Sequence, residues 1–176
     1  GRDDCRIQYE EGGRWQYGGR SLCCVNHPRF RQRSIRIAEM LGIRFAGDPA
    51  VMGWQIDNEP GMYGVRCHCE HCKAQFRDWL ASRFGTISAL NERLGMVFNA
   101  SEYRSFDDIP LPRLVQDLHN PGLLMESIRF FSESYAQFVA AQAEALRAAG
   151  AKQPITTNVC HMLSSNCRVQ ETRLFQ

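Results

Sequence analysis

The chain has 176 residues, of which 44% are hydrophobic and 23% charged, and its net charge is +2. These values are typical of one globular domain with a sizeable core. The mild charge and the lack of a Lys/Arg run argue against a nucleic-acid partner, and no apolar run approaches the ~20 residues of a membrane span.

The predicted elements alternate between helices and strands. Residues 1–27 are rich in Gly, Arg and polar groups, which predicts a long loop. A helix follows over 28–45, with proline at its start, and then a short apolar strand over 51–56. The order is completed by helices over 72–84, 88–94 and 123–149, an irregular excursion over 95–122, and a strand over 154–159.

Strands joined by helical crossovers predict parallel pairing, as in an α/β sheet or barrel. Two parallel strands cannot form a sheet with both faces covered. We therefore expect residues 1–176 to be a single-domain part of a (β/α)8 TIM barrel, an incomplete barrel running from about strand 3 or 4 to strand 5 with their helices. A complete barrel of this kind has ~250 residues.

A carboxylate follows the first predicted strand, in the stretch VMGWQIDNEPG. In a parallel barrel, active sites form at the carboxyl ends of the strands. There Glu59 would be partly desolvated, with a raised pKa that suits a general acid, and Asn58 could offer an amide to a substrate hydroxyl. The alternative is an ordinary polar turn around Pro60 and Gly61, and taken alone the D-N-E-P-G cluster favours the turn.

Three of the eight cysteines crowd into a C-x-C-x-x-C motif at Cys67, Cys69 and Cys72. Thiolates at this spacing can reach one tetrahedral zinc ion, whereas closely spaced cysteines bridge each other only with strain. The alternative is a set of free, buried thiols. A closed structural zinc site needs a fourth ligand, and the sequence leaves five candidates open: Cys23, Cys24, His27, His68 and His71.

Other positions give weaker signals. Arg20 follows a Gly-Gly pair and could recognise a ligand or be one of many solvated arginines. Asn158 ends the second predicted strand, where it could belong to a site or only cap the strand. Cys160 and His161 could pair as a nucleophilic dyad, although nothing in the sequence orients the histidine.

Taken together, these motifs resemble the family 42 glycoside hydrolases, the bacterial β-galactosidases. The likeness runs along nearly the whole chain, through EEGGRWQYGGR, DPAVMGWQIDNEPG, CKAQFRDWLASRFGTISALNERLG, YRSFDDIPLPR, NPGLLMESIRFFSES and PITTNV. The resemblance implies a (β/α)8 catalytic barrel of a retaining enzyme with two catalytic glutamates. It places the nucleophile outside this sequence, so residues 1–176 alone are expected to be inactive.

The resemblance also implies roles for individual residues. Glu59 falls on the family's general acid/base, Asn58 on the asparagine near the sugar 2-OH, and Arg20 on an arginine that holds galactose. The family's four-cysteine site for structural Zn2+ falls on Cys24, Cys67, Cys69 and Cys72. Cys24 is preferred to its neighbour Cys23 because C-V-N-H lines up with the family's Cys-Pro-Asn-Ser.

The implied substrate is a terminal β-D-galactoside, and the implied assembly of the full-length enzyme is a homotrimer. An α-L-arabinopyranoside or β-D-fucoside is the alternative substrate, and a zinc-stapled carbohydrate-binding module without catalysis is the alternative class. The sequence departs from the family at Ser21, Cys23 and Pro60, which bears on the pocket rim and sugar preference. The polar first residues predict a cytoplasmic protein, with an upstream signal peptide left open because the sequence begins without methionine.

Overall fold

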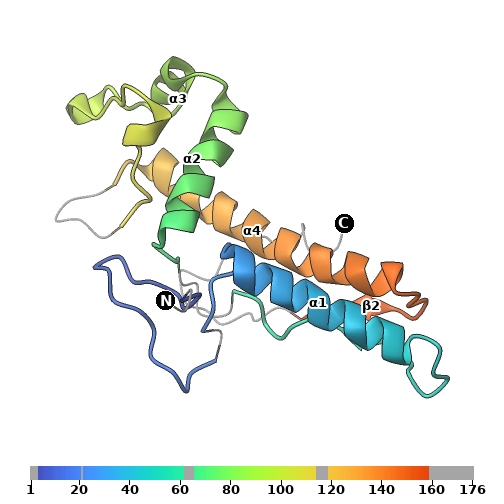
Figure 1. Ribbon diagram of the computed structural model, residues 1–176. Helices are drawn as coiled ribbons and strands as arrows, with labels where there is room; N and C mark the ends of the chain where they lie inside the picture. The colour runs from blue at the N-terminus through green and yellow to red at the C-terminus, as the bar shows by residue number, and fades with distance from the viewer. Residues whose placement is uncertain (1–3, 21, 62–65, 114–118, 159–176) are drawn as a thin grey trace.

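The computed structural model describes residues 4–20, 22–61, 66–113 and 119–158. Its elements, in chain order, are α1 (Pro28–Phe45), β1 (Trp54–Gln55), α2 (Glu70–Phe84), α3 (Ile87–Arg93), the 3-10 turns η1 (Phe98–Ala100) and η2 (Phe106–Asp108), α4 (Pro121–Ala148) and β2 (Ile155–Thr156) (Figure 1). The proposed dyad of Cys160 and His161 lies outside the described residues, as do Ser21 and Val159.

The two strands form a parallel pair, as the helical crossover between them predicts. Trp54 lies opposite Ile155. The N–H of Trp54 donates to the carbonyl of Pro154 at 2.9 Å, and the N–H of Ile56 donates to the carbonyl of Thr156 at 2.8 Å. The carboxyl ends of both strands therefore lie at the same edge of the sheet.

The strands are shorter than the predicted ranges 51–56 and 154–159. At the start of the first range, the N–H of Val51 donates to the carbonyl of Asp48 at 3.1 Å, so that residue closes a turn instead of joining the sheet. At the start of the second range, Pro154 has no N–H to donate. An apolar run identified the first strand and β-rich composition the second, but backbone pairing sets their ends.

Helices α1 and α4 lie side by side and run in the same direction (Figure 1). Near the start of the contact, Phe30 stacks on Phe138 with ring centroids 5.4 Å apart. Further along, Gly42 packs against Leu146 and Ala149, and a Cβ at position 42 would lie 2.6 Å from the Cβ of Ala149. Each helix precedes one strand of the parallel pair, so the shared direction is the one that a repeating βα barrel requires.

Besides the contact between α1 and α4, a hydrophobic core forms where α2 crosses the first half of α4 (Figure 1). Phe76 and Leu80 are fully buried, and the ring of Phe76 lies 5.4 Å from that of Phe130. Phe84, on the same side of the helix, is partly buried against this core. The helix begins at Glu70, two residues before the predicted start.

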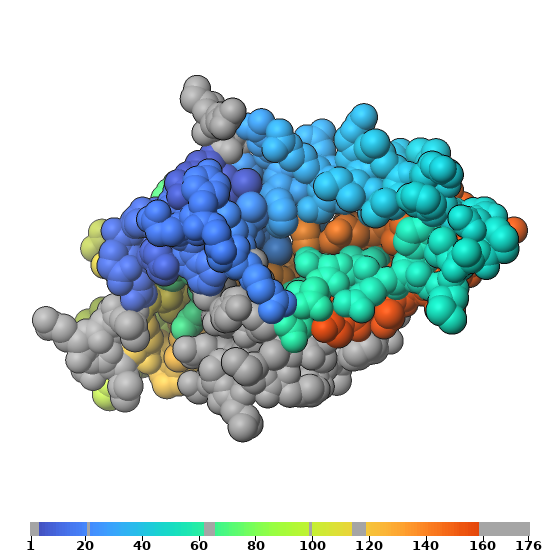
Figure 2. Space-filling model, turned by 90° about the horizontal axis from the view of Figure 1, so that it is seen from below, coloured from blue at the N-terminus to red at the C-terminus, as the bar shows by residue number. Residues whose placement is uncertain are grey.

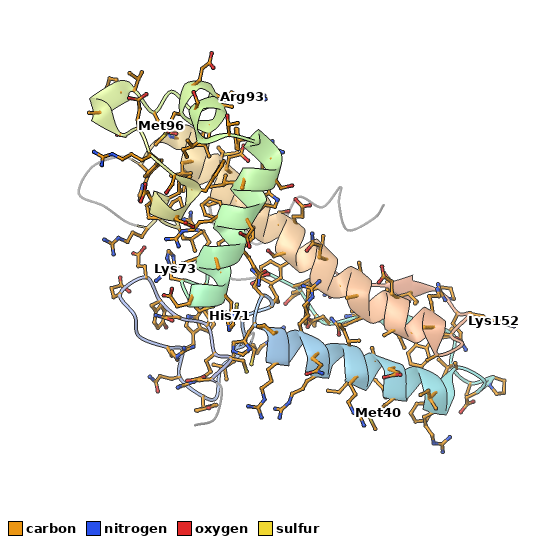
Figure 3. The ribbon with its side chains drawn as sticks, turned by 45° about the horizontal axis from the view of Figure 1, so that its top comes forward. Met40, His71, Lys73, Arg93, Met96 and Lys152 are labelled. Atoms are coloured by element: carbon orange, nitrogen blue, oxygen red, sulfur yellow. The ribbon has the colours of Figure 1, made fainter. Side chains whose placement is uncertain are left out.

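The bounds of α1 match the predicted range 28–45. Part of its apolar surface is exposed, because Ala38 is buried whereas Ile37, Met40, Leu41 and Ile43 are exposed. Figure 3 shows Met40 pointing away from α4. Figure 2 shows the polar amino-terminal segment, in dark blue, gathered at the amino-terminal end of this helix.

Among the described residues, no helix combines the length and apolarity needed to cross a membrane.

Candidate active site and cysteine cluster

Glu59 lies just past β1, at the carboxyl end of the parallel pair. Its side chain is 25% exposed. The oxygen Oε2 accepts a hydrogen bond from Nη2 of Arg20 at 3.1 Å and another from Nδ2 of Asn58 at 3.2 Å. The structure therefore brings together the three residues to which the family resemblance assigned acid/base and sugar-binding roles, although Arg20 lies 39 positions from Glu59.

The backbone around Glu59 is held in an uncommon conformation. Asp57 and Glu59 have φ values of 55° and 50°, in the left-handed region that side chains other than glycine rarely adopt. Residues 57–61 form a chain of bends and a turn, so the turn that the sequence favoured is present. It also presents the carboxylate, and backbone outliers of this kind concentrate at functional sites.

Asn158, at the end of the second strand, is hydrogen-bonded to this turn. Its Oδ1 accepts the backbone N–H of Glu59 at 3.0 Å, and its Nδ2 donates to Oδ1 of Asn58 at 3.2 Å. The amide of Gln55, on β1, also donates to Oδ1 of Asn158 at 3.2 Å. Sequence reasoning left Asn158 open and missed Gln55, whose only signal is its position on the strand before the acid.

The four cysteines at 24, 67, 69 and 72 form one buried cluster whose sulfur atoms all lie within 4.8 Å of one another. The sulfur of Cys24 is 3.4 Å from that of Cys72 and 3.9 Å from that of Cys69. A tetrahedral zinc ion with bonds of 2.3 Å holds its sulfur ligands about 3.8 Å apart. The cluster therefore has the size and ligand set of a closed four-coordinate metal site.

Two loops and one helix supply these sulfurs. Cys24 comes from the loop before α1, whereas Cys67 and Cys69 come from the segment before α2 and Cys72 from its first turn. Figure 3 shows His71 at this end of α2, beside the start of α1. A metal ion held here would tie the beginnings of the two helices together.

Hydrogen bonds from outside the cluster reach two of its sulfurs. The backbone N–H of Gln8 donates to Sγ of Cys67 at 3.4 Å, and Nδ2 of Asn26 donates to Sγ of Cys72 at 3.5 Å. Donors aimed at sulfur stabilise the thiolate form that a metal ion requires.

Within the cluster, contacts between the thiols shift their pKa values in opposite directions. Hydrogen bonding to neighbouring sulfurs raises the pKa of Cys24 and Cys72 above the ordinary thiol value. The same bonds lower the pKa of Cys67 and Cys69. Four thiolates this close would repel one another, so full ionisation of the cluster requires a bound cation.

Of the five candidates for a fourth ligand, Cys24 joins the other three cysteines, and the described histidines do not belong to the group. The sulfur of Cys23 instead lies 3.5 Å from that of Cys5. Burial, with a contribution from the hydrogen bond to Cys5, raises the pKa of Cys23 to about 12. The rings of His27 and His71 pack edge to face, with centroids 4.7 Å apart.

Comparison with known proteins identifies the family. The model of glycoside hydrolase family 42, described as beta-galactosidase, matches residues 3–176. The chain is 42% identical to beta-galactosidase BgaA of a Thermus species over 149 residues. This match covers 84% of this chain and 23% of that protein. It is 37% identical to beta-galactosidase Bga of Halorubrum lacusprofundi over 158 residues. This second match covers 89% of this chain and 23% of that protein.

Solved structures agree with the sequence comparison. The polyextremophilic beta-galactosidase of Halorubrum lacusprofundi superposes with a TM-score of 0.83 at 36% identity, over 90% of this chain and 24% of that chain. The beta-galactosidase of the psychrophilic Marinomonas ef1 gives a TM-score of 0.82 at 32% identity, over 88% of this chain and 24% of that chain.

The chain therefore belongs to glycoside hydrolase family 42, as its motifs predicted. Its fold is part of an α/β barrel. It spans about a quarter of the length of the relatives that it matches.

Proposed function

We propose that this chain carries the general acid/base of a retaining β-galactosidase. The observation that carries the proposal is the position of Glu59 at the carboxyl end of a parallel strand pair, where Arg20 and Asn58 both donate to its carboxylate. This is the edge at which barrel enzymes build their active sites. The names of the relatives, all beta-galactosidases, support the substrate class.

In the proposed reaction, a second glutamate from another part of the barrel attacks the anomeric carbon of the galactoside while Glu59 protonates the departing glycosidic oxygen. A covalent glycosyl-enzyme results. Glu59, now ionised, then removes a proton from water as the water attacks the same carbon and releases galactose. The two carboxyl groups of a retaining pair stand ~5–5.5 Å apart.

Arg20 and Asn58 position the sugar in this proposal. The side chain of Arg20 is 60% exposed, so it has N–H groups that can reach a sugar hydroxyl as well as Glu59. Asn58 is held from both sides, because its amide donates to Glu59 and its Oδ1 accepts from Asn158. This leaves the amide little freedom to turn and suits it to orient a hydroxyl beside the acid.

The decisive experiment replaces Glu59 with Gln in the full-length enzyme. A galactoside with a poor, alkyl leaving group needs protonation, so its kcat/KM should fall ~10²–10⁴-fold. An activated aryl galactoside leaves without protonation, so its kcat/KM should fall much less, whereas kcat should drop because water is no longer activated.

The matched control is Asp57→Asn, which alters the neighbouring exposed carboxylate. Asn keeps the oxygen that accepts the N–H of Asn58 and tolerates the left-handed backbone, so activity should stay close to wild type. Equal losses of kcat/KM for both leaving groups in Glu59→Gln would contradict the acid role.

We further infer that the four-cysteine cluster binds a structural Zn2+ ion. The inference is supported by four buried sulfurs at tetrahedral spacing and by the two N–H donors that point at them. Four protein ligands leave no open position for water, so the ion would stabilise the fold and take no part in hydrolysis.

A further inference from the structure

Two cysteines outside the metal cluster also lie against each other. The sulfurs of Cys5 and Cys23 are 3.5 Å apart, and both residues are half-buried. Arg6 and Cys23 form an antiparallel bridge, and the N–H of Cys24 donates to the carbonyl of Cys5 at 2.8 Å. Backbone pairing therefore holds the two thiols together, 18 positions apart in the sequence.

The two sulfurs are in contact but not at bonding distance. The S–S bond is about 2.05 Å long, so the sulfurs need to approach by about 1.5 Å, which side-chain rotation can supply on a backbone that is already paired. Neither thiol belongs to the group that could hold a metal ion. The pair is therefore free to react while Cys24, Cys67, Cys69 and Cys72 hold a metal ion.

We propose that Cys5 and Cys23 form a reversible disulfide by exchange with a low-molecular-weight disulfide such as oxidised glutathione. One cysteine sulfur attacks a sulfur of the reagent, forms a mixed disulfide and releases one thiol. The second cysteine sulfur then attacks the mixed disulfide and releases the other thiol. The cysteine pair loses two electrons and two protons, and the reagent gains them as two thiols.

The bond would close the loop that carries Arg20. Arg20 lies three positions before Cys23 and contacts Glu59 across the site. The disulfide would limit how far this loop can move from the site. Any effect on the KM for galactosides rests on the proposed function, whereas formation of the bond does not.

The test equilibrates the zinc-loaded full-length enzyme in glutathione buffers of increasing oxidised fraction. Long incubation is needed because both thiols are half-buried, which slows their exchange with the reagent. Free thiols are then alkylated, and the protein is digested with trypsin without reduction. Trypsin cleaves between the two cysteines, after Arg6, Arg14 and Arg20. A native disulfide therefore appears as two peptides that stay linked until a reductant is added.

The expected result is one linked pair per chain, lost in both Cys5→Ser and Cys23→Ser. Loss in Cys23→Ser distinguishes a bond to Cys23 from one to the adjacent Cys24, which lies in the same tryptic peptide. Zinc content should be unchanged in either variant. If Cys5 and Cys23 are both still alkylated after incubation with fully oxidised glutathione, the proposal is overturned. A link that survives Cys23→Ser would overturn it as well. Because the readout is a peptide mass, it stands apart from galactosidase activity.

Discussion

Asn158 shows how single side chains support the proposed acid. Its Oδ1 accepts the N–H of Glu59, and its Nδ2 donates to Asn58, so one amide bonds both residues of the Asn-Glu pair. The left-handed backbone of Glu59 costs ~1–3 kcal/mol for a residue other than glycine. A hydrogen bond from the neighbouring strand helps to hold the chain in that conformation.

Removal of this amide should misplace the acid without removing it. We expect Asn158→Ala to lower kcat/KM of the full-length enzyme ~10–100-fold, since a misplacement of about 1 Å can cost 10²-fold. Asn158→Asp keeps the acceptor for the N–H of Glu59 but loses the donor to Asn58, so its loss should be smaller than that of Asn158→Ala.

Lys152→Ala, an exposed position ahead of the same strand, is the control and should match wild type. Wild-type kcat/KM in a folded Asn158→Ala enzyme would show that the turn holds Glu59 unaided.

At the scale of elements, the cysteine cluster joins the starts of α1 and α2, which the hydrophobic cores do not join directly. One core lies around α2, α3 and the first half of α4, and the other lies between α1, the end of α4 and the strands. Cys24, ahead of α1, packs in the first core, whereas α1 itself contributes to the second. Metal binding would therefore couple two parts of the fold.

We expect Cys24→Ser to lower the zinc content of the purified enzyme from one ion per chain towards zero and to lower its thermal midpoint. Cys23→Ser, under reducing conditions, should keep both values, because its sulfur lies with Cys5 and outside the cluster. Metal analysis by mass spectrometry and a thermal scan measure the two effects. Full zinc retention in Cys24→Ser would assign the fourth ligand to another residue.

The contact between α1 and α4 permits a test in which two effects oppose each other. Alanine is favoured over glycine in a helix by ~1 kcal/mol. At position 42, however, the new Cβ would lie 2.6 Å from the Cβ of Ala149, so the two helices must move apart. We expect Gly42→Ala to destabilise the fold by about 1–3 kcal/mol, the usual cost of overpacking.

The thermal midpoint of unfolding measures this effect. Gly47→Ala is the matched control, because nothing lies within 4 Å of a Cβ there, and its midpoint should remain within experimental error of wild type. A higher midpoint for Gly42→Ala would mean that helix propensity outweighs the contact with Ala149.

At the scale of the whole molecule, the described residues form a two-stranded sheet, and α1 has an exposed apolar face. Among the described residues, the Glu59 carboxylate accepts hydrogen bonds from Arg20 and Asn58, and its backbone N–H donates to Asn158. A retaining hydrolase needs a second carboxylate ~5–5.5 Å from the first. In our proposal, residues 1–176 supply the acid of such a site together with the groups that position it.

We therefore expect residues 1–176, expressed alone, to release no detectable product from a chromogenic β-galactoside that the full-length enzyme hydrolyses. Addition of zinc should not restore activity, because the ion is structural in our proposal. Hydrolysis by residues 1–176 that Glu59→Gln abolishes would refute this expectation, since it would place a complete catalytic pair within this sequence.

Local chemistry made much of the molecule predictable from its sequence. Proline and glycine punctuation with apolar periodicity predicted α1 to the residue and identified the other helices to within a few positions. The helical crossover predicted the parallel strands, and the C-x-C-x-x-C spacing predicted three members of the cluster. Each of these signals acts over a few residues, where backbone geometry limits the choices.

The sequence by itself thus determined the elements, the family and the identity of the candidate acid. Only the tertiary structure decided that Arg20 meets Glu59, Asn158 meets the Asn-Glu pair and Cys23 meets Cys5. It groups Cys24 with the other three cysteines, as the family resemblance implied. It also showed that part of the apolar face of α1 is exposed. The physical reason is that side-chain contacts across 18 to 100 positions depend on how helices and loops pack, which no local pattern specifies.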